Sequence, residues 1–155
     1  PKIIYFSSTQ VEKGTLYGKS KELCEKMLEN FSNKKKSSIT IFRLANIFGE
    51  GSKPFYNTVI ATFCYQVANG SKLTINNSAI KFNFVYVKDV VKIVIKEIFK
   101  KRQKPFYLKY ITTNNIISIG KLAKLIQSFT KNKKNKLKSK FNRDLYRTYL
   151  SFVKK

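Results

Sequence analysis

The stretch Phe6-Ser7-Ser8-Thr9, followed after a short polar loop by Tyr17-Gly18-Lys19-Ser20-Lys21, constrains the architecture of this chain most strongly. The continuous apolar run over residues 2–7 predicts a buried strand. Apolar residues then recur at helical spacing over residues 16–31, which predicts a helix. A strand leading through a loop into a helix is typical of a parallel β-α unit, so the sequence predicts an α/β fold.

The rest of the chain continues this alternation. We predict further strands over 39–42, 73–75, 82–87 and 106–111, and further helices over 56–69, 118–129, 141–152 and from Asp89 to Ile98. Residues 46–54 are expected to form a loop, and residues 131–140 a basic linker before the aromatic helix 141–152. A parallel sheet is buried on both faces. The strand over 2–7 therefore needs neighbours, and we expect the natural chain to begin upstream of residue 1.

The composition is strongly basic, with 32 Lys and Arg against 8 Asp and Glu and a net charge of +24. Such a charge is typical of nucleic-acid binding. However, nearly all of the basic residues are lysines, whereas bidentate recognition of bases and phosphates favours arginine. We therefore interpret the positive charge as a solvated basic surface in a chain whose composition is rich in Lys, Asn and Ile. We do not expect nucleic acid as a partner.

The two cysteines, Cys24 and Cys64, are isolated, and the chain has no histidine. A metal site is therefore not expected. We expect two buried, reduced thiols rather than a disulfide, although the count alone allows one. No apolar run reaches transmembrane length and no signal peptide is visible, so we expect a cytoplasmic protein that does not engage a membrane.

Tyr17 and Lys21 lie four residues apart and share one helical face. An ammonium group close to a phenol favours the phenolate and lowers a phenol's pKa, so such a pair can transfer a proton near neutral pH. Thr9 lies just past the first strand. It is placed to hydrogen-bond the same substrate oxygen with which the tyrosine would exchange a proton. A Tyr-x-x-x-Lys pair alone is weak evidence, because such pairs occur by chance on helix surfaces. The order of strand, Ser-Ser-Thr, loop and helix strengthens the interpretation.

These segments resemble the extended short-chain dehydrogenase/reductase family. Residues 43–49 (Arg-Leu-Ala-Asn-Ile-Phe-Gly) and 84–90 (Phe-Val-Tyr-Val-Lys-Asp-Val) are similar to two later segments of that family. Residues 53–65 and 144–151 resemble one branch, the bifunctional reductases of capsular-polysaccharide precursor synthesis. Those proteins join an N-terminal reductase domain to a C-terminal zinc cupin domain. The resemblance implies that residues 1–155 are the C-terminal part of a Rossmann-like parallel sheet with a substrate-binding subdomain of helices and strands.

The resemblance also implies roles for individual residues. Tyr17 would be the general acid, Lys21 would assist it and bind the nicotinamide ribose, and Thr9 would hold the ketone. Backbone at Leu44 and Ala45 would line the nicotinamide. Asn46 would contact the nucleotide sugar; for Asn57 a substrate contact and a structural role at a helix start stay equally open, and for Tyr86 a core role is favoured.

The implied reaction is NADPH-dependent reduction of the C4 ketone of a UDP-linked N-acetyl deoxyhexose, with NADP(H) or NAD(H) as cofactor. The chain departs from the family in having no Gly-x-x-Gly-x-x-Gly turn, which receives the dinucleotide pyrophosphate. Many family members have Arg-Asp at the position where this chain has Phe82-Asn83. The capsular branch also lacks that arginine. The implied partners are therefore a UDP-sugar, the missing N-terminal half and the cupin domain; a homo-oligomer is compatible with the resemblance.

Three hypotheses follow. The chain is part of a reductase completed by another segment, or an inactive truncated remnant, or a basic binding module without catalysis. The first predicts turnover when the halves are combined. The second predicts a poorly folded species, because orphan parallel strands lack partners, and the third predicts salt-sensitive binding of an anionic polymer.

Overall fold

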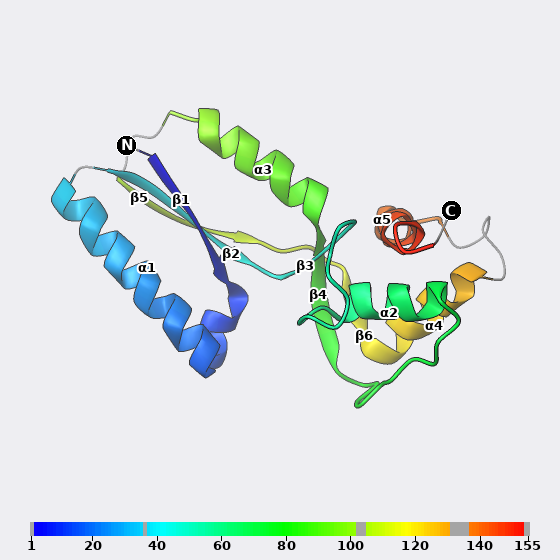
Figure 1. The fold of residues 1–155 in the computed structure, drawn as a ribbon. Coiled ribbons are helices and arrows are strands. Elements are labelled where there is room, and N and C mark those ends of the chain that lie inside the picture. Colours follow the sequence, from blue (N-terminus) through cyan, green and yellow to red (C-terminus); the bar gives the residue numbers. More distant parts are fainter. Residues whose placement is uncertain (1, 36, 102–104, 131–136, 154–155) are drawn as a thin grey trace. The chain divides into compact units, whose positions relative to one another are not determined.

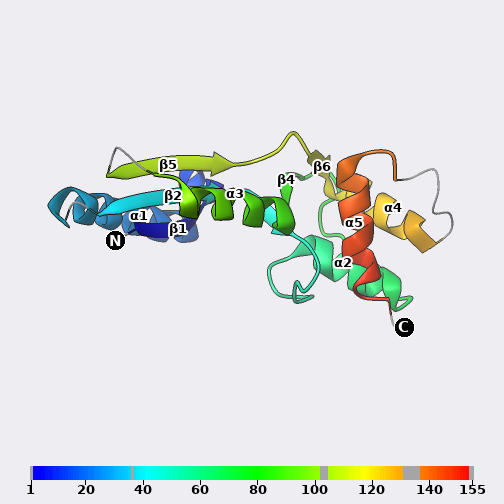
Figure 2. The ribbon, with the colours of Figure 1, turned by 90° about the horizontal axis from the view of Figure 1, so that it is seen from above.

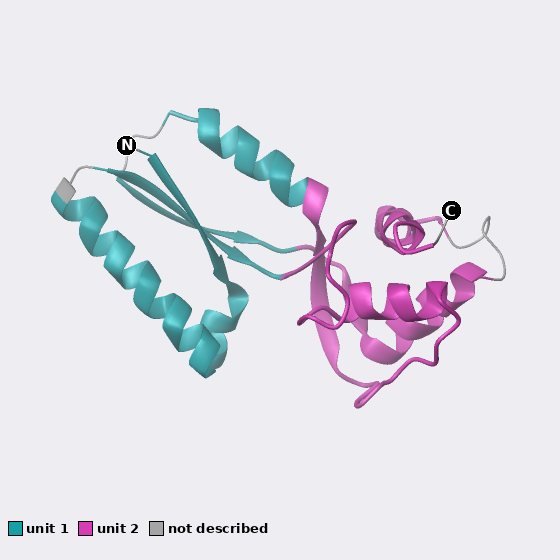
Figure 3. Cartoon of the chain, viewed as in Figure 1, with its two compact units in different colours: residues 1–45, 89–112 teal, residues 46–88, 113–155 magenta. Residues whose placement is uncertain are grey.

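The computed structural model describes residues 2–35, 37–101, 105–130 and 137–153. These residues form two compact units (Figure 3). Unit 1 comprises residues 1–45 and 89–112, and unit 2 comprises residues 46–88 and 113–155. Each unit has its own sheet and its own buried side chains.

Unit 1 is built on a parallel sheet in the order β1-β2-β5, formed by β1 (Lys2–Ser8), β2 (Ser38–Leu44) and β5 (Phe106–Ile111). Ser8 pairs with Leu44 and Leu44 with Ile111, so the three strands end at one edge. The short 3₁₀ helix η1 (Thr9–Lys13) and then α1 (Leu16–Lys35) follow β1. Figure 1 shows α1 and α3 (Val87–Phe99) along opposite faces of this sheet.

Unit 2 contains a small sheet in the order β3-β4-β6, formed by β3 (Asn46–Phe48), β4 (Lys81–Tyr86) and β6 (Ile116–Ser118). β3 runs parallel to β4, whereas β6 runs antiparallel to it. Three helices pack on one another beside this sheet: α2 (Val59–Ala68), α4 (Ile119–Gln127) and α5 (Lys140–Leu150). η2 (Ser128–Thr130) extends α4, and α5 is seen end-on in Figure 1 and along its length in Figure 2.

The two units are packed differently. Unit 2 holds a continuous apolar cluster in which aromatic rings of α5 meet Phe129 and Phe48, so the aromatic stripe of the last helix serves packing. In unit 1 residues 39–42 in the middle of the central strand β2 are fully buried, and several polar side chains are buried around them. Among these are Ser7, Glu25, Thr40 and Glu97. Polar groups in such positions need hydrogen-bond partners, and these four side chains have them.

Most predicted elements are confirmed. The strands over 2–7, 39–42, 82–87 and 106–111 correspond to β1, β2, β4 and β5, and the five helices correspond to α1 to α5. Ser118 caps α4, since its side chain accepts a hydrogen bond from the Lys121 backbone N–H at 3.3 Å. Asp89 lies in the first turn of α3, which begins two residues earlier than predicted. The larger part of the predicted linker, residues 131–136, lies outside the described residues, and Lys140 already belongs to α5.

Three local predictions are wrong, and one strand was not predicted. Residues 73–75 form no strand; Leu73 instead packs on the apolar cluster of unit 2. The predicted loop 46–54 begins with β3, and β6 was not predicted, because three-residue strands leave almost no periodic signal. The helix predicted from residue 56 begins at Val59, since Asn57 has a left-handed backbone (φ 51°) and Thr58 is the N-cap.

The apolar stripe of α1 does not face the core of unit 1. Leu16, Leu23 and Met27 are 88%, 61% and 63% exposed. The face turned to the sheet instead carries Lys21 and Glu25. Hydrophobic periodicity therefore located this helix correctly but indicated the wrong buried face.

Candidate active site

The loop between β1 and α1 is built from local hydrogen bonds. The Ser8 hydroxyl accepts from the Gln10 backbone N–H at 3.2 Å, which starts η1, and Gly14 ends η1 in the left-handed conformation (φ 64°). The Thr15 hydroxyl then accepts from the Gly18 backbone N–H at 3.0 Å, the pattern of a helix N-cap. The order of serine, threonine and glycine residues thus turns the chain from the end of β1 into α1.

Gly18 is needed because η1 lies against the first turn of α1. A Cβ atom at this position would overlap the carbonyl oxygen of Gln10 and lie 2.9 Å from its carbonyl carbon. The glycine in Tyr17-Gly18-Lys19 therefore lets the η1 backbone approach the helix that carries Tyr17 and Lys21.

The structure brings Tyr17 and Lys21 together. The Lys21 Nζ lies 5.8 Å from the ring centroid of Tyr17 and 5.0 Å from that of Tyr5. It also donates a hydrogen bond to the carbonyl oxygen of Phe6 at 3.2 Å. Tyr17 is 51% exposed. The ammonium group is therefore anchored to the end of β1, beside an accessible phenol.

Leu44 is the last residue of β2, and Thr9 and Ala45 directly follow β1 and β2, whose ends coincide. Thr9 is the first residue of η1, directly after Ser8, and Ser8 pairs with Leu44. Ala45 is buried and donates a backbone hydrogen bond to the carbonyl oxygen of Ile111 at 3.1 Å. Ligands of parallel α/β sheets bind beyond the carboxyl ends of the strands, which is where unit 1 places these three residues.

Asn46 and Asn57 belong to unit 2, where both line a cavity of about 280 Å³. The Asn46 side-chain amide donates to the carbonyl oxygen of Asn83 at 3.2 Å. The cavity also has apolar walls, contributed by Ile47, Phe82 and Phe84. A concave site that combines apolar walls with polar side chains is a candidate for small-molecule binding.

Tyr86 is buried, as predicted, and its role is structural. Its hydroxyl donates to the Glu50 carboxylate at 2.7 Å, and the Lys88 ammonium donates to the same group at 2.9 Å. Burial raises the pKa of Glu50, but these hydrogen bonds outweigh it and hold the pKa below its usual value. The loop after β3 is thereby tied to the end of β4.

The cysteine prediction is half right. Cys64 is fully buried in the apolar cluster of unit 2, and burial raises the pKa of its thiol. Cys24 is exposed on α1, and both cysteines are free. In the part of the chain that the structure describes, no cluster of three or more His, Cys, Asp or Glu side chains could hold a metal ion. None of the described helices is long and apolar enough to cross a bilayer.

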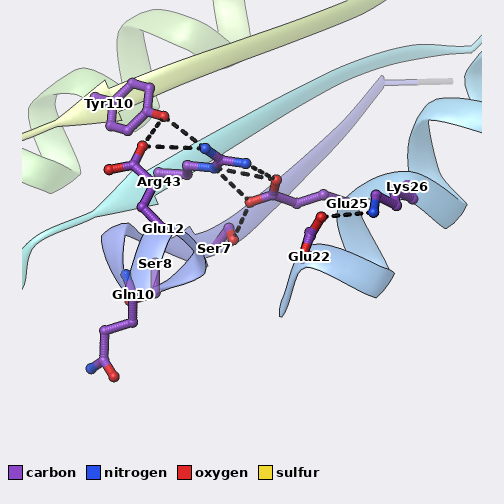
Figure 4. A network of polar contacts seen from close by, with 9 residues as sticks. All are labelled: Ser7, Ser8, Gln10, Glu12, Glu22, Glu25, Lys26, Arg43 and Tyr110. Atoms are coloured by element: carbon purple, nitrogen blue, oxygen red, sulfur yellow. Dashed lines mark hydrogen bonds and ion pairs between the residues drawn. The ribbon is translucent and has the colours of Figure 1, made fainter. Parts of the chain in front are cut away.

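Sequence reasoning missed a buried polar network in unit 1 (Figure 4). Arg43 Nη2 donates to Glu25 Oε2 at 2.6 Å, and Arg43 Nε donates to Glu25 Oε1 at 3.0 Å. The Ser7 hydroxyl also donates to Glu25. The hydrogen bonds with Glu25 raise the pKa of Arg43 above its ordinary value. The available signal was the spacing of Glu25, four residues beyond Lys21 on the same helical face.

Comparison with known protein families identifies the family to which this α/β chain belongs. The model of the NAD dependent epimerase/dehydratase family matches residues 1–108. The chain belongs to this family.

Individual relatives narrow the resemblance. The chain is 35% identical to the UDP-2-acetamido-2,6-beta-L-arabino-hexul-4-ose reductase of Pseudomonas aeruginosa, over 97% of this chain and 41% of that protein. It is 30% identical to the capsular polysaccharide assembling protein CapF of Staphylococcus aureus, with a TM-score of 0.86 over 99% of this chain and 44% of that one. The chain thus spans less than half the length of either relative.

A more distant structure shows the fold alone. The UDP-glucose 4-epimerase of Thermotoga maritima, solved with UDP-glucose, is 20% identical, with a TM-score of 0.82 over 97% of this chain and 63% of that one. These relatives confirm the predicted α/β fold with a Rossmann-like parallel sheet.

Proposed function

We propose that this chain is the catalytic and sugar-binding portion of a nucleotide-sugar reductase, which reduces the C4 ketone of a UDP-linked N-acetyl deoxyhexose for a surface polysaccharide. The observation that carries the proposal is the position of the Lys21 ammonium, between the ring of Tyr17 and the carboxyl end of β1. The 35% identity to a UDP-hexulose reductase supports the choice of reaction.

The proposed chemistry uses three residues of unit 1. The Thr9 hydroxyl holds the C4 carbonyl oxygen of the sugar. When hydride reaches the C4 carbon, the carbonyl electron pair moves to this oxygen, and the Tyr17 hydroxyl donates its proton there, giving the alcohol. The Lys21 ammonium stabilises the remaining phenolate through its positive charge. Donation by a positioned side chain of this kind is worth about 10²- to 10⁴-fold in rate.

A nicotinamide dinucleotide, NADP(H) or NAD(H), would supply the hydride. The residues present fit its nicotinamide end: Lys21 offers donors for the ribose, and the backbone at Leu44 and Ala45 lies at the carboxyl end of β2. They do not fit its pyrophosphate, because the sequence has no Gly-x-x-Gly-x-x-Gly turn. The cofactor therefore requires a further segment.

The edge of β1 supports this requirement. Among the described strands β1 pairs only with β2, so its other edge carries unpaired backbone groups. Apolar side chains are also exposed on the flanking helices, such as Met27 (63%) on α1 and Ile95 (49%) on α3. A segment that adds a parallel strand to β1 and helices beside it would cover these surfaces.

The cavity of unit 2 supports the assignment of Asn46 and Asn57 to substrate binding. A volume of about 280 Å³ accommodates part of a nucleotide sugar. Asn57 has a left-handed backbone (φ 51°), a conformation that costs free energy and is often kept at functional positions.

The test is reconstitution. The chain is co-expressed with the dinucleotide-binding half of a relative that carries the glycine turn, and nicotinamide oxidation is followed with a UDP-linked 4-keto N-acetyl deoxyhexose, using NADPH and NADH in parallel. We expect turnover that neither part gives alone. A stable reconstituted complex without turnover would refute the proposal; salt-sensitive binding of RNA by the chain alone would favour the basic binding module instead.

A further inference from the structure

We propose that Arg43, paired with Glu25, is a positioning residue that holds both elements carrying the candidate catalytic groups, η1 with Thr9 and α1 with Tyr17 and Lys21. The roles of those three groups rest on the proposed function. The geometry that Arg43 imposes on η1 and α1 is a property of this chain and can be tested without turnover.

The guanidinium group of Arg43 contacts three elements of unit 1 besides its own strand β2, and it is linked to a fourth, β1, through Glu25 (Figure 4). It binds Glu25 of α1 through Nε and Nη2, and Glu25 in turn accepts from Ser7 of β1. Through Nη1 it lies 3.4 Å from Glu12 of η1 and donates to the Tyr110 hydroxyl of β5 at 2.7 Å. The Tyr110 hydroxyl also donates to Glu12 at 2.5 Å.

The pair at the centre of this network is shielded from water. The side chains of Glu25 and Arg43 are 7% and 15% exposed. A buried carboxylate held by a two-pronged guanidinium has a fixed direction as well as a fixed distance. Lysine offers a point charge and cannot reproduce this fork. The position of α1 across the sheet therefore depends on arginine at residue 43.

The spacing along α1 transmits this position to the candidate catalytic pair. Tyr17, Lys21 and Glu25 follow one another at intervals of four residues and lie on one face of the helix. Rotation of α1 about its axis would move all three together. With Glu25 fixed, Lys21 is held where it meets the Tyr5 ring and the carbonyl oxygen of Phe6.

The opposite face of the sheet provides a matched comparison. There the buried carboxylate of Glu97, on α3, accepts from Thr40 at 2.7 Å and from Lys109 at 3.2 Å. The hydrogen bonds of Glu97 to Thr40 and Lys109 join α3 to β2 and β5. However, α3 carries none of the candidate catalytic residues. Removing the Lys109 cation should cost stability without moving Tyr17 or Lys21.

The experiment compares Arg43→Lys and Glu25→Gln with Lys109→Met in the full chain by NMR. The readout is the nuclear Overhauser contact between the ε-methylene protons of Lys21 and the ring protons of Tyr5, which joins α1 to β1. We expect Arg43→Lys and Glu25→Gln to reduce its intensity about twofold or more and to shift the amide signal of Thr9. Lys109→Met should leave both signals unchanged.

If the variants at the shielded residues Arg43 and Glu25 unfold, two variants at exposed positions still test the proposal. Tyr110→Phe and Glu12→Gln remove only the exposed arm of the network, and each should shift the Thr9 amide while the contact between Lys21 and Tyr5 persists. The proposal is wrong if Arg43→Lys leaves both the Thr9 amide and the contact between Lys21 and Tyr5 as in the parent. Where Arg43→Lys unfolds, the proposal is wrong if Tyr110→Phe and Glu12→Gln leave the Thr9 amide unshifted. It is equally wrong if Lys109→Met produces the same changes.

The reconstituted enzyme gives a second readout. A misplacement of about 1 Å costs on the order of 10²-fold in rate, so Arg43→Lys should lower kcat about 10- to 100-fold with little change in KM. Lys109→Met should keep kcat within about twofold. If the parent shows no turnover, the proposed function fails while the NMR comparison still decides the role of Arg43; unchanged kcat in an active Arg43→Lys enzyme would overturn it.

Discussion

The backbone of Gln10 lies so close to Gly18 that no side chain fits between them. This relationship explains why a glycine interrupts a helix between two candidate catalytic residues, Tyr17 and Lys21. Elsewhere in a helix a glycine is unfavourable by about 1 kcal/mol relative to alanine. Here the absence of a side chain at Gly18 allows η1, and with it Thr9, to approach the first turn of α1.

Gly18→Ala should therefore destabilise the chain. The overlap with Gln10 forces η1 or α1 to move, and overpacking of this kind costs about 1–3 kcal/mol, which exceeds the gain in helix propensity. Urea unfolding measures the change. Ser20→Ala, two residues along the same helix, is the control and should change stability by less than about 0.5 kcal/mol. A Gly18→Ala chain as stable as the parent would show that η1 does not lie against α1.

Tyr5 predicts a loss of stability in alkali. Burial, with contributions from a hydrogen bond to Cys24 and the charge of Glu25, raises the pKa of Tyr5 to about 12. The folded state thus favours the neutral phenol, whose ordinary pKa is about 10. This contribution is complete below about pH 10 and is lost as the pH rises towards 12.

Tyr5→Phe should remove that part of the pH dependence. The measurement is the free energy of unfolding in urea across this pH range, with Tyr56→Phe, a substitution at an exposed site, as the control. Equal alkaline slopes for the Tyr5→Phe chain and the parent would contradict the account.

Glu50 predicts the opposite dependence in acid. Its pKa lies below the usual value because the bonds from Tyr86 and Lys88 outweigh the effect of burial. The folded state favours the carboxylate, so the contribution is present above about pH 4.3 and is lost as the pH falls through the lower folded value. Glu50→Gln should flatten this acid slope, whereas the exposed Glu29→Gln should keep it. An acid slope in the Glu50→Gln chain as steep as the parent's would argue against the bonds to Tyr86 and Lys88.

The two cysteines should differ in reactivity. Cys24 is exposed, whereas Cys64 is fully buried and has a raised pKa. A thiol reagent at neutral pH should modify Cys24 in the native chain and Cys64 only on unfolding, since the thiolate is the reactive form. Mass spectrometry of Cys24→Ser, labelled with and without urea, measures this. Rapid native labelling of that variant would show that unit 2 opens readily.

The sequence predicted which segments form helices and strands better than it predicted which face of each element is buried. Continuous apolar runs located β1 and β2, and Ser118 marked the start of α4 correctly, because these signals are local. The apolar stripe of α1 indicated the wrong buried face, because periodicity shows which side chains share a face of a helix but not which face meets the sheet. Residues 73–75 resembled a strand in composition, yet strand formation requires a neighbour that only the tertiary fold provides.

In the candidate site, likewise, a contact within one helix was predictable from the sequence, whereas contacts between elements were not. Tyr17 and Lys21 could be paired from their spacing alone, because a helix fixes that geometry. The partnership of Glu25 with Arg43 could not, since it joins residues of different elements and depends on the register of β1 with β2. A substrate contact was predicted for Asn46 by resemblance, whereas for Asn57 a substrate contact and a role at a helix start stayed equally open. The cavity that both residues line arises from the folding of unit 2.

The central claim is that the Tyr17 hydroxyl donates the proton in ketone reduction. The most direct measurement is kcat of the reconstituted enzyme carrying Tyr17→Phe, which keeps the ring beside Lys21 and removes only the hydroxyl. Tyr65→Phe, in a ring-packing position of unit 2, serves as the control. We predict a fall of about 10²- to 10⁴-fold in kcat for Tyr17→Phe and little change for Tyr65→Phe. Full activity in the Tyr17→Phe enzyme would contradict the account.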